Sequence, residues 1–556
     1  MYHSPLILAL LVTLANMAKP VVIDDTAYLA YARHAAIHPG DPYGFDIYWY
    51  SEPESAFGVL CPPVVPYWLA IGIRLFGEHI ALLKLWLLPF VWLFAASVRS
   101  LLRRFAPGTD SRLLPLIVLS PAVLPMVNVM LDLPALALGL GAVVLFIRAG
   151  DVGSWRLAII AGLLAALAMQ TKYTMLLIPP ALGWYGLTHG RFRLVLSVVA
   201  VAVAIAGFAA WEFVLVEQYG QSHFLFHAAD QAAAPSDASK VMAFVRSKLS
   251  LSGPLVGHLG CLGVGVGLVG FAALGVPRRG LATLGTAWGV GFVLIAVLPG
   301  SATNFAVATL WKTFGTLWLI GGAGCAVLLT FRLGKGLRLR WNADSAFLVG
   351  WLLLELAGYF ALTPFGAARR LVGLIVVGGL VVGRVLSRVE RVKPERRTPG
   401  WLIGFGIGAG VAVAAIDAFD AYPEKDCAER ATAIVPRDRP ADALVWYTGH
   451  WGFQYYCERA GMTPLVPGRS LLLPGDILVL PIHPNEDGFY RPHTGSAPIR
   501  VPPWAAEELA EVVWDDWLSA TTVPNFYGGG LAVVGRDHPR LRVIVYRVIE
   551  PWQVPR

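Results

Sequence analysis

The sequence predicts a mostly α-helical, polytopic membrane protein with a small α/β domain at its C-terminal end. Of its 556 residues, 56% are hydrophobic and only 14% are charged, whereas soluble proteins carry about 25% charged residues. Apolar runs of about 20 residues, long enough to cross a bilayer as helices, recur up to Phe419. Beyond Phe419 the runs stop, and the chain becomes polar enough to fold in water.

Clusters of basic residues separate the apolar runs and set the expected orientation. The chain has a net charge of +8, and its basic residues form short clusters at 99–112, 148–156, 191–193, 278–279, 332–340 and 384–397. Such clusters mark cytoplasmic loops, and because they lie between apolar runs they do not indicate a nucleic-acid-binding face. About thirteen spans follow: 4–19, 80–98, 113–129, 134–148, 156–171, 174–188, 194–216, 254–274, 281–298, 306–331, 343–363, 371–387 and 400–419.

This arrangement places the N-terminus in the cytoplasm and the C-terminus outside. The first span lacks a basic start and a good cleavage site, so we expect it to be retained. Three long stretches lie outside, at about 19–79, 217–253 and from 420 onward. The first contains an apolar segment after Cys61 that we expect to form an interfacial helix, because a span there would put the next arginines outside.

The C-terminal stretch is expected to fold separately, which divides the chain into a membrane domain, 1–420, and a domain of residues 421–556. Strand-like segments lie at 443–447, 476–481 and 541–546, with a short helix at 452–460. Five cysteines show no metal-binding spacing. An oxidising compartment would allow Cys427 and Cys457 to form a disulfide; the alternative is two separate buried thiols.

Two adjacent carboxylates, Asp24 and Asp25, follow the first span. Acids at this position can simply end a span in water. The residues after them, however, place Tyr28, Tyr31 and Ala32 on one helical face, as in a helix at the membrane surface. A carboxylate held there could accept a proton from an acceptor hydroxyl beside an anionic lipid, so both aspartates are candidate catalytic residues.

Further polar residues are expected at the same outer face. A lone lysine in an outer turn requires a partner, and the forked guanidinium of arginine suits phosphate. Arginines that only contact lipid headgroups are the alternative interpretation. The candidate substrate-binding residues are Asp132, Lys172, Tyr173, His223, His227, Arg369 and Arg370.

Several of these segments resemble GT-C glycosyltransferases of the protein O-mannosyltransferase and lipid A aminoarabinose transferase type. The segment from Ile23 to Arg33 resembles their acidic first-loop motif, and Cys61-Pro-Pro-Val-Val-Pro-Tyr-Trp resembles the segment that follows it. Leu131-Asp-Leu-Pro and Thr171-Lys-Tyr-Thr come in the same order. The resemblance, which covers about residues 1–420, implies that Asp24 is the catalytic carboxylate and that Lys172 contacts the donor phosphate. Asp25 and Cys61 depart from the family pattern, which has Asp-Glu at the acidic pair and His or Asn at Cys61.

The resemblance implies transfer of a sugar from a polyprenyl-monophosphate donor to a hydroxyl or amine on the outer face of a bacterial inner membrane. The expected partners are this donor, the bilayer and an acceptor lipid, glycan or protein. No metal or other cofactor is required, because Lys and Arg can bind a monophosphate. The alternative is a lipid or polysaccharide transporter, which would place its polar groups near the bilayer midplane.

Overall fold

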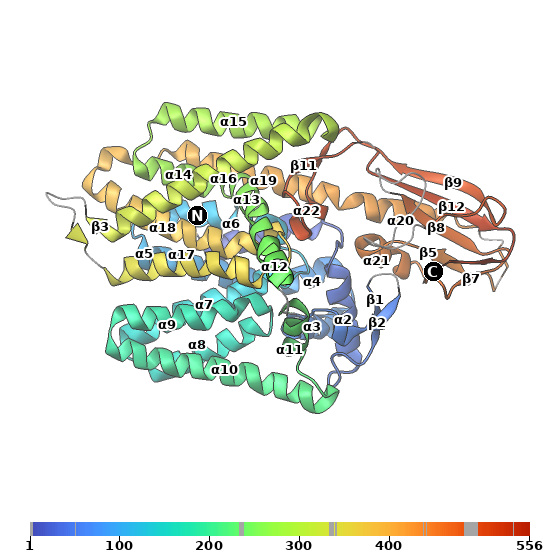
Figure 1. Cartoon of the computed structure of the whole chain (residues 1–556), viewed down its shortest axis with the longest axis horizontal. Coiled ribbons are helices and arrows are strands. Elements are labelled where there is room, and N and C mark those ends of the chain that lie inside the picture. Colours follow the sequence, from blue (N-terminus) through green and yellow to red (C-terminus); the bar gives the residue numbers. More distant parts are fainter. Residues whose placement is uncertain are drawn as a thin grey trace.

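The computed structural model describes residues 4–49, 52–232, 238–332, 338–339, 342–436, 439–440, 442–482, 499–537 and 539–555. The predicted fold class is confirmed. The chain is mostly helical, the long helices run side by side along the long axis of the molecule, and a sheet lies at one end (Figure 1). Lys335 and Arg340, from one of the basic clusters, lie outside the described residues.

The first ten helices lie in the predicted spans and the first outer loop. Their bounds are α1 (Pro5–Met17), α2 (Asp25–Ile37), α3 (Val64–Phe76), α4 (Ile80–Trp86), α5 (Leu88–Phe105), α6 (Asp110–Val118), α7 (Asp132–Val152), α8 (Trp155–Met169), α9 (Ile178–His189) and α10 (Arg191–Tyr219). Of these, α6 and α9 cover only part of their predicted spans. The remaining helices are α11 (His223–Ala232), α12 (Ala238–Ser250), α13 (Ser252–Leu262), α14 (Val264–Leu274), α15 (Arg278–Val297), α16 (Gly300–Thr330), α17 (Ala343–Leu362), α18 (Val372–Val392), α19 (Gly400–Asp420), α20 (Tyr422–Ile434), α21 (Trp451–Arg459) and α22 (Val523–Tyr527).

Within the described chain, 8 helices are long and apolar enough to cross a membrane, or up to 9 if one bent pair is counted. The bent pair covers the predicted span 254–274, and its two parts meet at an angle of 79°. The helices α1, α3 and α8 are apolar but shorter. The predicted span 113–129 is wrong as a continuous helix. It ends at Val118 because Pro121 and Pro125, which lack the amide hydrogen a helix needs, follow closely.

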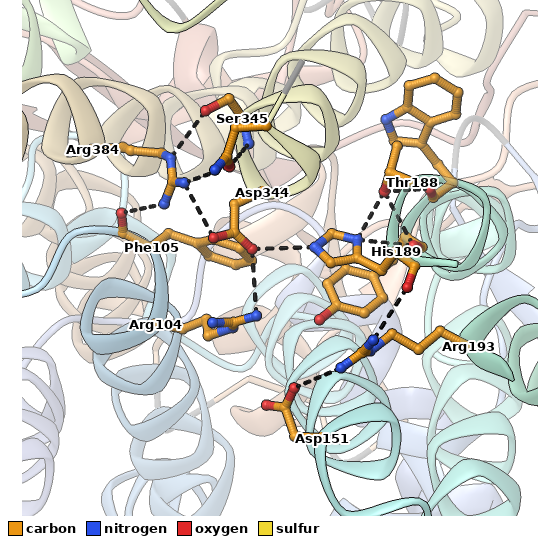
Figure 2. Close-up of polar contacts among 12 residues, drawn as sticks. Arg104, Phe105, Asp151, Thr188, His189, Arg193, Asp344, Ser345 and Arg384 are labelled. Carbon is orange, nitrogen blue, oxygen red and sulfur yellow. Dashed lines mark hydrogen bonds and ion pairs between the residues drawn. The ribbon is translucent and has the colours of Figure 1, made fainter. Parts of the chain in front are cut away.

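The basic helix ends meet at one end of the helical body, as the charge pattern requires. Asp344, at the start of α17, forms ion pairs with Arg384 at 3.1 Å and Arg104 at 3.4 Å, and one of its oxygens lies 3.1 Å from Nε2 of His189 (Figure 2). Beside it, Arg193 pairs with Asp151 at 3.6 Å. These contacts join α5, α7, α9, α10, α17 and α18 at their basic ends. That this end faces the cytoplasm stays a prediction.

The C-terminal part contains a five-stranded sheet in the order β6-β5-β8-β12-β9. Its strands are β5 (Val445–Tyr447), β6 (Thr463–Pro464), β8 (Ile477–Ile482), β9 (Ala506–Trp514) and β12 (Leu541–Val548). β5 is parallel to β6 and β8, whereas β12 is antiparallel to β8 and β9. Small antiparallel pairs join β1 (Asp46–Tyr48) to β2 (Pro53–Ser55), β3 (Phe331–Arg332) to β4 (Arg338–Leu339), β7 (Leu471–Leu472) to β13 (Trp552–Gln553) and β10 (Ala520–Thr521) to β11 (Val534–Gly535).

The sheet packs against α20 and α21 through a hydrophobic cluster that contains Cys427 and Cys457. Both cysteines are buried and free. The predicted disulfide is therefore wrong, and the alternative of two buried thiols holds: each sulfur fills apolar space, as cysteine commonly does in a core.

Residues 515–537 leave the sheet and enter the helical body. The amide of Ser519 donates to the carbonyl of Ala296 at 2.8 Å, and the indole of Trp311 donates to the carbonyl of Val533 at 3.1 Å. We call residues 515–537 the inserted segment. Through it, the last part of the chain packs among the membrane helices that precede it.

Candidate active site

The turn that precedes α2 holds Asp24 and Asp25 in a strained backbone. Ile23 has a φ of +43°, a left-handed conformation that is a genuine outlier for a β-branched residue. Such strain persists only where the surroundings enforce it, and it is frequent at functional sites. The turn fixes the directions of the two carboxylates that follow.

Asp24 faces an arginine from a distant part of the sequence. Its Oδ2 accepts from Nη1 of Arg369 at 2.5 Å, and the hydroxyl of Tyr28 lies 3.4 Å from the same oxygen. The Asp24 side chain is 17% exposed, against 6% for that of Arg369. The carboxylate is thus held by a buried cation and keeps one accessible side.

Arg369 also approaches a second acid, Asp132, at the start of α7. Their closest nitrogen and oxygen are 3.7 Å apart, and Nζ of Lys172 pairs with the other oxygen of Asp132. Burial lowers the pKa of Lys172 to about 8, against the opposing effect of Asp132. The partner that the sequence predicted for this lysine is therefore Asp132. The four side chains form a chain of alternating charge, Asp24–Arg369–Asp132–Lys172, which we call the ionic cluster.

Asp25 lies apart from the ionic cluster. It is fully buried and its Oδ2 accepts from the amide of Val22 at 3.1 Å and from the side-chain amide of Asn128. Burial raises the pKa of Asp25 to about 7, against the opposing effects of Lys84 and Lys19. Adjacent helical residues point about 100° apart, which is why neighbours in sequence meet different surroundings here.

Arg370, unlike Arg369, is not paired with an acidic side chain among the described residues. Among the described residues it forms no ion pair, its Nε has no hydrogen-bond partner, and its guanidinium lies 4.6 Å from the centre of the Phe365 ring. Lys248 of α12 lies nearby, and its Nζ donates to the carbonyl of Thr363 at 3.1 Å. Two cations with spare hydrogen-bond donors therefore adjoin the ionic cluster.

These cations border a largely apolar cavity of about 380 Å³. Its polar rim includes Lys172, Lys248 and Arg370, and its apolar wall includes Leu60, Leu176, Phe224, Phe244 and Leu362. A narrower pocket shares Lys172 and Arg370 with it and continues to Asp132, Arg369, Glu355 and Tyr359. The narrower pocket thus connects the apolar cavity to the ionic cluster, and Lys172 and Arg370 lie where the two spaces meet.

Tyr173, His223 and His227 form a separate aromatic group on the cavity side. The hydroxyl of Tyr173 lies 2.6 Å from Nδ1 of His223, and the His223 ring stacks on Tyr43 with centroids 4.7 Å apart. Burial, and then the nearby His227, lowers the pKa of His223 to about 3. A neutral, buried histidine braces this wall, while Tyr173 and His227 line the cavity.

The structure thus brings Asp24, Asp132, Lys172, Arg369 and Arg370 together and leaves Asp25 and His223 in supporting positions. Sequence reasoning missed Lys248, although the charge bias that singled out Lys172 applies equally to it. It also missed Tyr527, whose ring lies 5.7 Å from the guanidinium of Arg369. No sequence pattern links residue 527 to this loop. Among the described residues, no group of three or more His, Cys, Asp or Glu side chains could hold a metal ion.

Comparison with known proteins gives one family match. Residues 61–213 match the family model described as dolichyl-phosphate-mannose-protein mannosyltransferase. This segment contains Asp132, Lys172 and Tyr173. No curated protein matches the sequence.

Two solved structures are distantly similar. One is the oligosaccharyltransferase AglB from Archaeoglobus fulgidus in complex with an inhibitory peptide and a dolichol-phosphate, with a TM-score of 0.49 and 14% identity over 84% of this chain and 64% of that chain. The chain therefore spans less than two thirds of AglB. The other is ArnT from Cupriavidus metallidurans bound to undecaprenyl phosphate, with a TM-score of 0.41 and 12% identity over 97% of both chains.

Both TM-scores lie below 0.5, so the function is argued from the site and from the family match. That match covers the stretch between Cys61 and the C-terminal half of α10, which includes three of the four segments on which the resemblance was based. The resemblance to protein O-mannosyltransferases is thereby confirmed over residues 61–213 of this multi-pass membrane protein.

Proposed function

We propose that the protein is a glycosyltransferase that moves a sugar from a polyprenyl-monophosphate donor to an acceptor hydroxyl or amine at the outer face of the membrane. The observation that carries the proposal is the apolar cavity bordered by Lys172, Lys248 and Arg370, which adjoins the ionic cluster that contains the partly exposed carboxylate of Asp24. An amphipathic donor needs an apolar chamber for its lipid chain and cations for its phosphate.

The donor phosphate binds where the two spaces meet. Arg370 is the principal contact, because among the described residues it carries a positive charge without an ion-pair partner. Lys172 is shared with Asp132, and Lys248 donates to backbone carbonyls and lies over the Phe244 ring, so both lysines can add donors to phosphate oxygens. The polyprenyl chain lies along Leu176, Phe224 and Phe244. The hydrogen bonds from the three cations to the phosphate oxygens are charge-assisted, and such bonds are roughly twice as strong as neutral ones.

Asp24 is the general base. The acceptor oxygen or nitrogen attacks the anomeric carbon, the bond from that carbon to the phosphate oxygen breaks, and its electron pair leaves with the lipid phosphate. The acceptor proton passes to Asp24. Arg369 orients this carboxylate, and the cations around the phosphate stabilise the leaving group. Asp25 lacks access, because it is buried and bonded to Val22 and Asn128.

The position of the ionic cluster argues against a transporter. A transporter places its polar groups near the midplane, commonly in broken helices. Here Asp132 begins α7, Lys172 precedes the turn before α9, and Arg369 precedes α18. The cluster therefore lies at the ends of helices, opposite the basic ends shown in Figure 2. We infer that this end faces outward.

The test is release of polyprenyl phosphate by reconstituted protein. Proteoliposomes are incubated with polyprenyl-phosphate sugars extracted from bacterial membranes together with envelope acceptors, and the freed lipid phosphate is measured by mass spectrometry. Wild-type protein is expected to release it and Asp24→Asn to release almost none. Equal release by the two proteins would contradict the proposal, as would failure of undecaprenyl phosphate to bind the purified protein.

A further inference from the structure

The inserted segment is fixed at its base by a buried charge network. Arg540 is fully buried and pairs with Asp420 and, through Nε at 2.7 Å, with Asp516. The carboxylate of Asp420 also accepts from the amides of Thr522 at 3.0 Å and Val523 at 2.9 Å. These bonds tie the start of α22 to the end of α19. The segment therefore enters the helical body in one defined position.

Beyond α22, the inserted segment returns along α13 and α16. The amide of Ala532 donates to Nδ1 of His258 at 3.2 Å, and Asn304 exchanges two hydrogen bonds with Gly535, at 2.9 and 2.8 Å. The bonds of Asn304 involve no residue of the ionic cluster, whereas Nε2 of His258 also lies 2.9 Å from the carbonyl of Gly366, in the loop that carries Arg369. The bonds of Asn304 therefore supply a matched control.

Tyr527, at the end of α22, reaches the ionic cluster. Its side chain is buried, and its ring centre lies 5.7 Å from the guanidinium carbon of Arg369 and 5.0 Å from Nζ of Lys19. Its hydroxyl accepts from Lys19 at 2.7 Å and donates to the carbonyl of Pro125 at 2.9 Å. The ring is thus immobilised at its hydroxyl end and presents an aromatic surface to Arg369.

We propose that Tyr527 is a positioning residue, which holds the guanidinium of Arg369 against Asp24 and Asp132 and so completes the site from the other end of the chain. This inference rests on the proposed function. Arg369 has acids along one side only, and its Nε has no hydrogen-bond partner among the described residues. A desolvated guanidinium in this situation gains from an aromatic neighbour. The ring also occupies space into which the arginine could otherwise move.

Two substitutions separate the contribution of the ring from that of the hydroxyl. Tyr527→Phe keeps the ring beside Arg369 and loses only the bonds to Lys19 and Pro125. Tyr527→Leu removes the ring. We expect the leucine variant to lose roughly tenfold or more in kcat, with the KM for donor nearly unchanged, because Arg370, Lys172 and Lys248 bind the phosphate. The phenylalanine variant should recover most of the lost kcat.

Two controls separate positioning from stability. Asn304→Ala loosens the inserted segment where it meets α16, in two bonds that involve no residue of the ionic cluster, and should lower Tm without lowering kcat per lipid-binding site. The second control is a double-mutant cycle with Arg369→Lys. If Tyr527 acts through Arg369, its removal should cost far less in that background, because groups that act as a unit are not additive.

The outcomes are distinct for the two proposals. If Asp24→Asn and Arg369→Lys impair transfer while Tyr527→Leu transfers normally, the positioning role is wrong and the proposed function stands. The positioning role is also wrong if the leucine variant loses equal activity in both arginine backgrounds. If none of these variants alters transfer, the catalytic role of the ionic cluster is wrong, and if the wild-type protein itself transfers no sugar, the proposed function fails.

Discussion

The guanidinium of Arg369 lies 2.5 Å from the carboxylate of Asp24, although 345 residues separate them in the sequence. The first belongs to the turn before α18 and the second to the loop after α1. The pair therefore forms only when early and late helices are packed together. Four predictions concern this pair, the cavity beside it and the orientation of the helices around it.

The first prediction distinguishes the two aspartates. Asp24→Asn removes proton acceptance while nearly preserving size, and general-base catalysis contributes roughly 10²–10⁴-fold. Transfer should fall by that order while the donor lipid still co-purifies. Asp25→Asn is the matched control. Its remaining oxygen can still accept from Val22 and Asn128, so it should retain most of the activity. Near-normal sugar transfer by both variants in reconstituted membranes would refute the catalytic role of this loop.

The second prediction concerns the donor phosphate. Arg370→Ala should weaken binding of undecaprenyl phosphate more than tenfold, because losing a desolvated charge contact costs roughly 2–5 kcal/mol. Lys172→Ala should also weaken it, but it leaves Asp132 without its lysine and will lower Tm as well. Arg246→Ala, an exposed arginine on the helix that carries Lys248, is the control. If the Arg370 and Arg246 variants bind undecaprenyl phosphate with equal affinity, Arg370 contacts lipid headgroups only.

The third prediction is a pH dependence of stability from His223. Its pKa is lowered to about 3 in the folded protein, against an ordinary value near 6.5. The folded state therefore binds fewer protons than the unfolded state between these values, so this contribution to stability is present at neutral pH and is lost as pH falls below about 6.5. His223→Phe keeps the stacking on Tyr43 but cannot titrate. Its Tm deficit relative to wild type should shrink between pH 7.5 and pH 5; a constant deficit would contradict the prediction.

The fourth prediction is the orientation. All five native cysteines are buried, so the folded protein should give almost no background with an impermeant thiol reagent. A cysteine introduced at Glu429, whose side chain is 59% exposed on α20, should be labelled on intact cells. A cysteine at Arg391, exposed at the end of α18, should be labelled only after the membrane is opened. The opposite pattern would invert the topology.

Sequence periodicity and charge bias predicted most of the helices because both follow directly from the demands of a bilayer. The failures have local causes. The stretch 113–129 is apolar enough for a span, but its prolines end the helix at Val118. The strand β9 was missed because Ala506-Glu-Glu-Leu-Ala-Glu contains residues that favour helices; its pairing with β12 decides its conformation.

The sequence predicted most residues of the site, but it did not predict which of them pair with each other. Lys172 needed a partner because a lone lysine at that depth is unfavourable, yet nothing in the sequence distinguishes Asp132 from the aspartates of the first loop. Likewise, Arg369 and Arg370 are adjacent and identical in type, and only the packing shows that the first is engaged by acids. Tyr527 could not be found, because only the packing of α22 brings its ring beside the guanidinium of Arg369.

The inserted segment also has a consequence for biogenesis. Asp24 emerges from the ribosome early and Tyr527 close to the end of synthesis, after every membrane helix has been made. Under the positioning role proposed for Tyr527, a nascent or prematurely terminated chain that is already in the membrane would bind lipid but transfer sugar roughly tenfold or more slowly than the whole protein. The order of synthesis would thus delay full activity until the inserted segment has packed among the membrane helices.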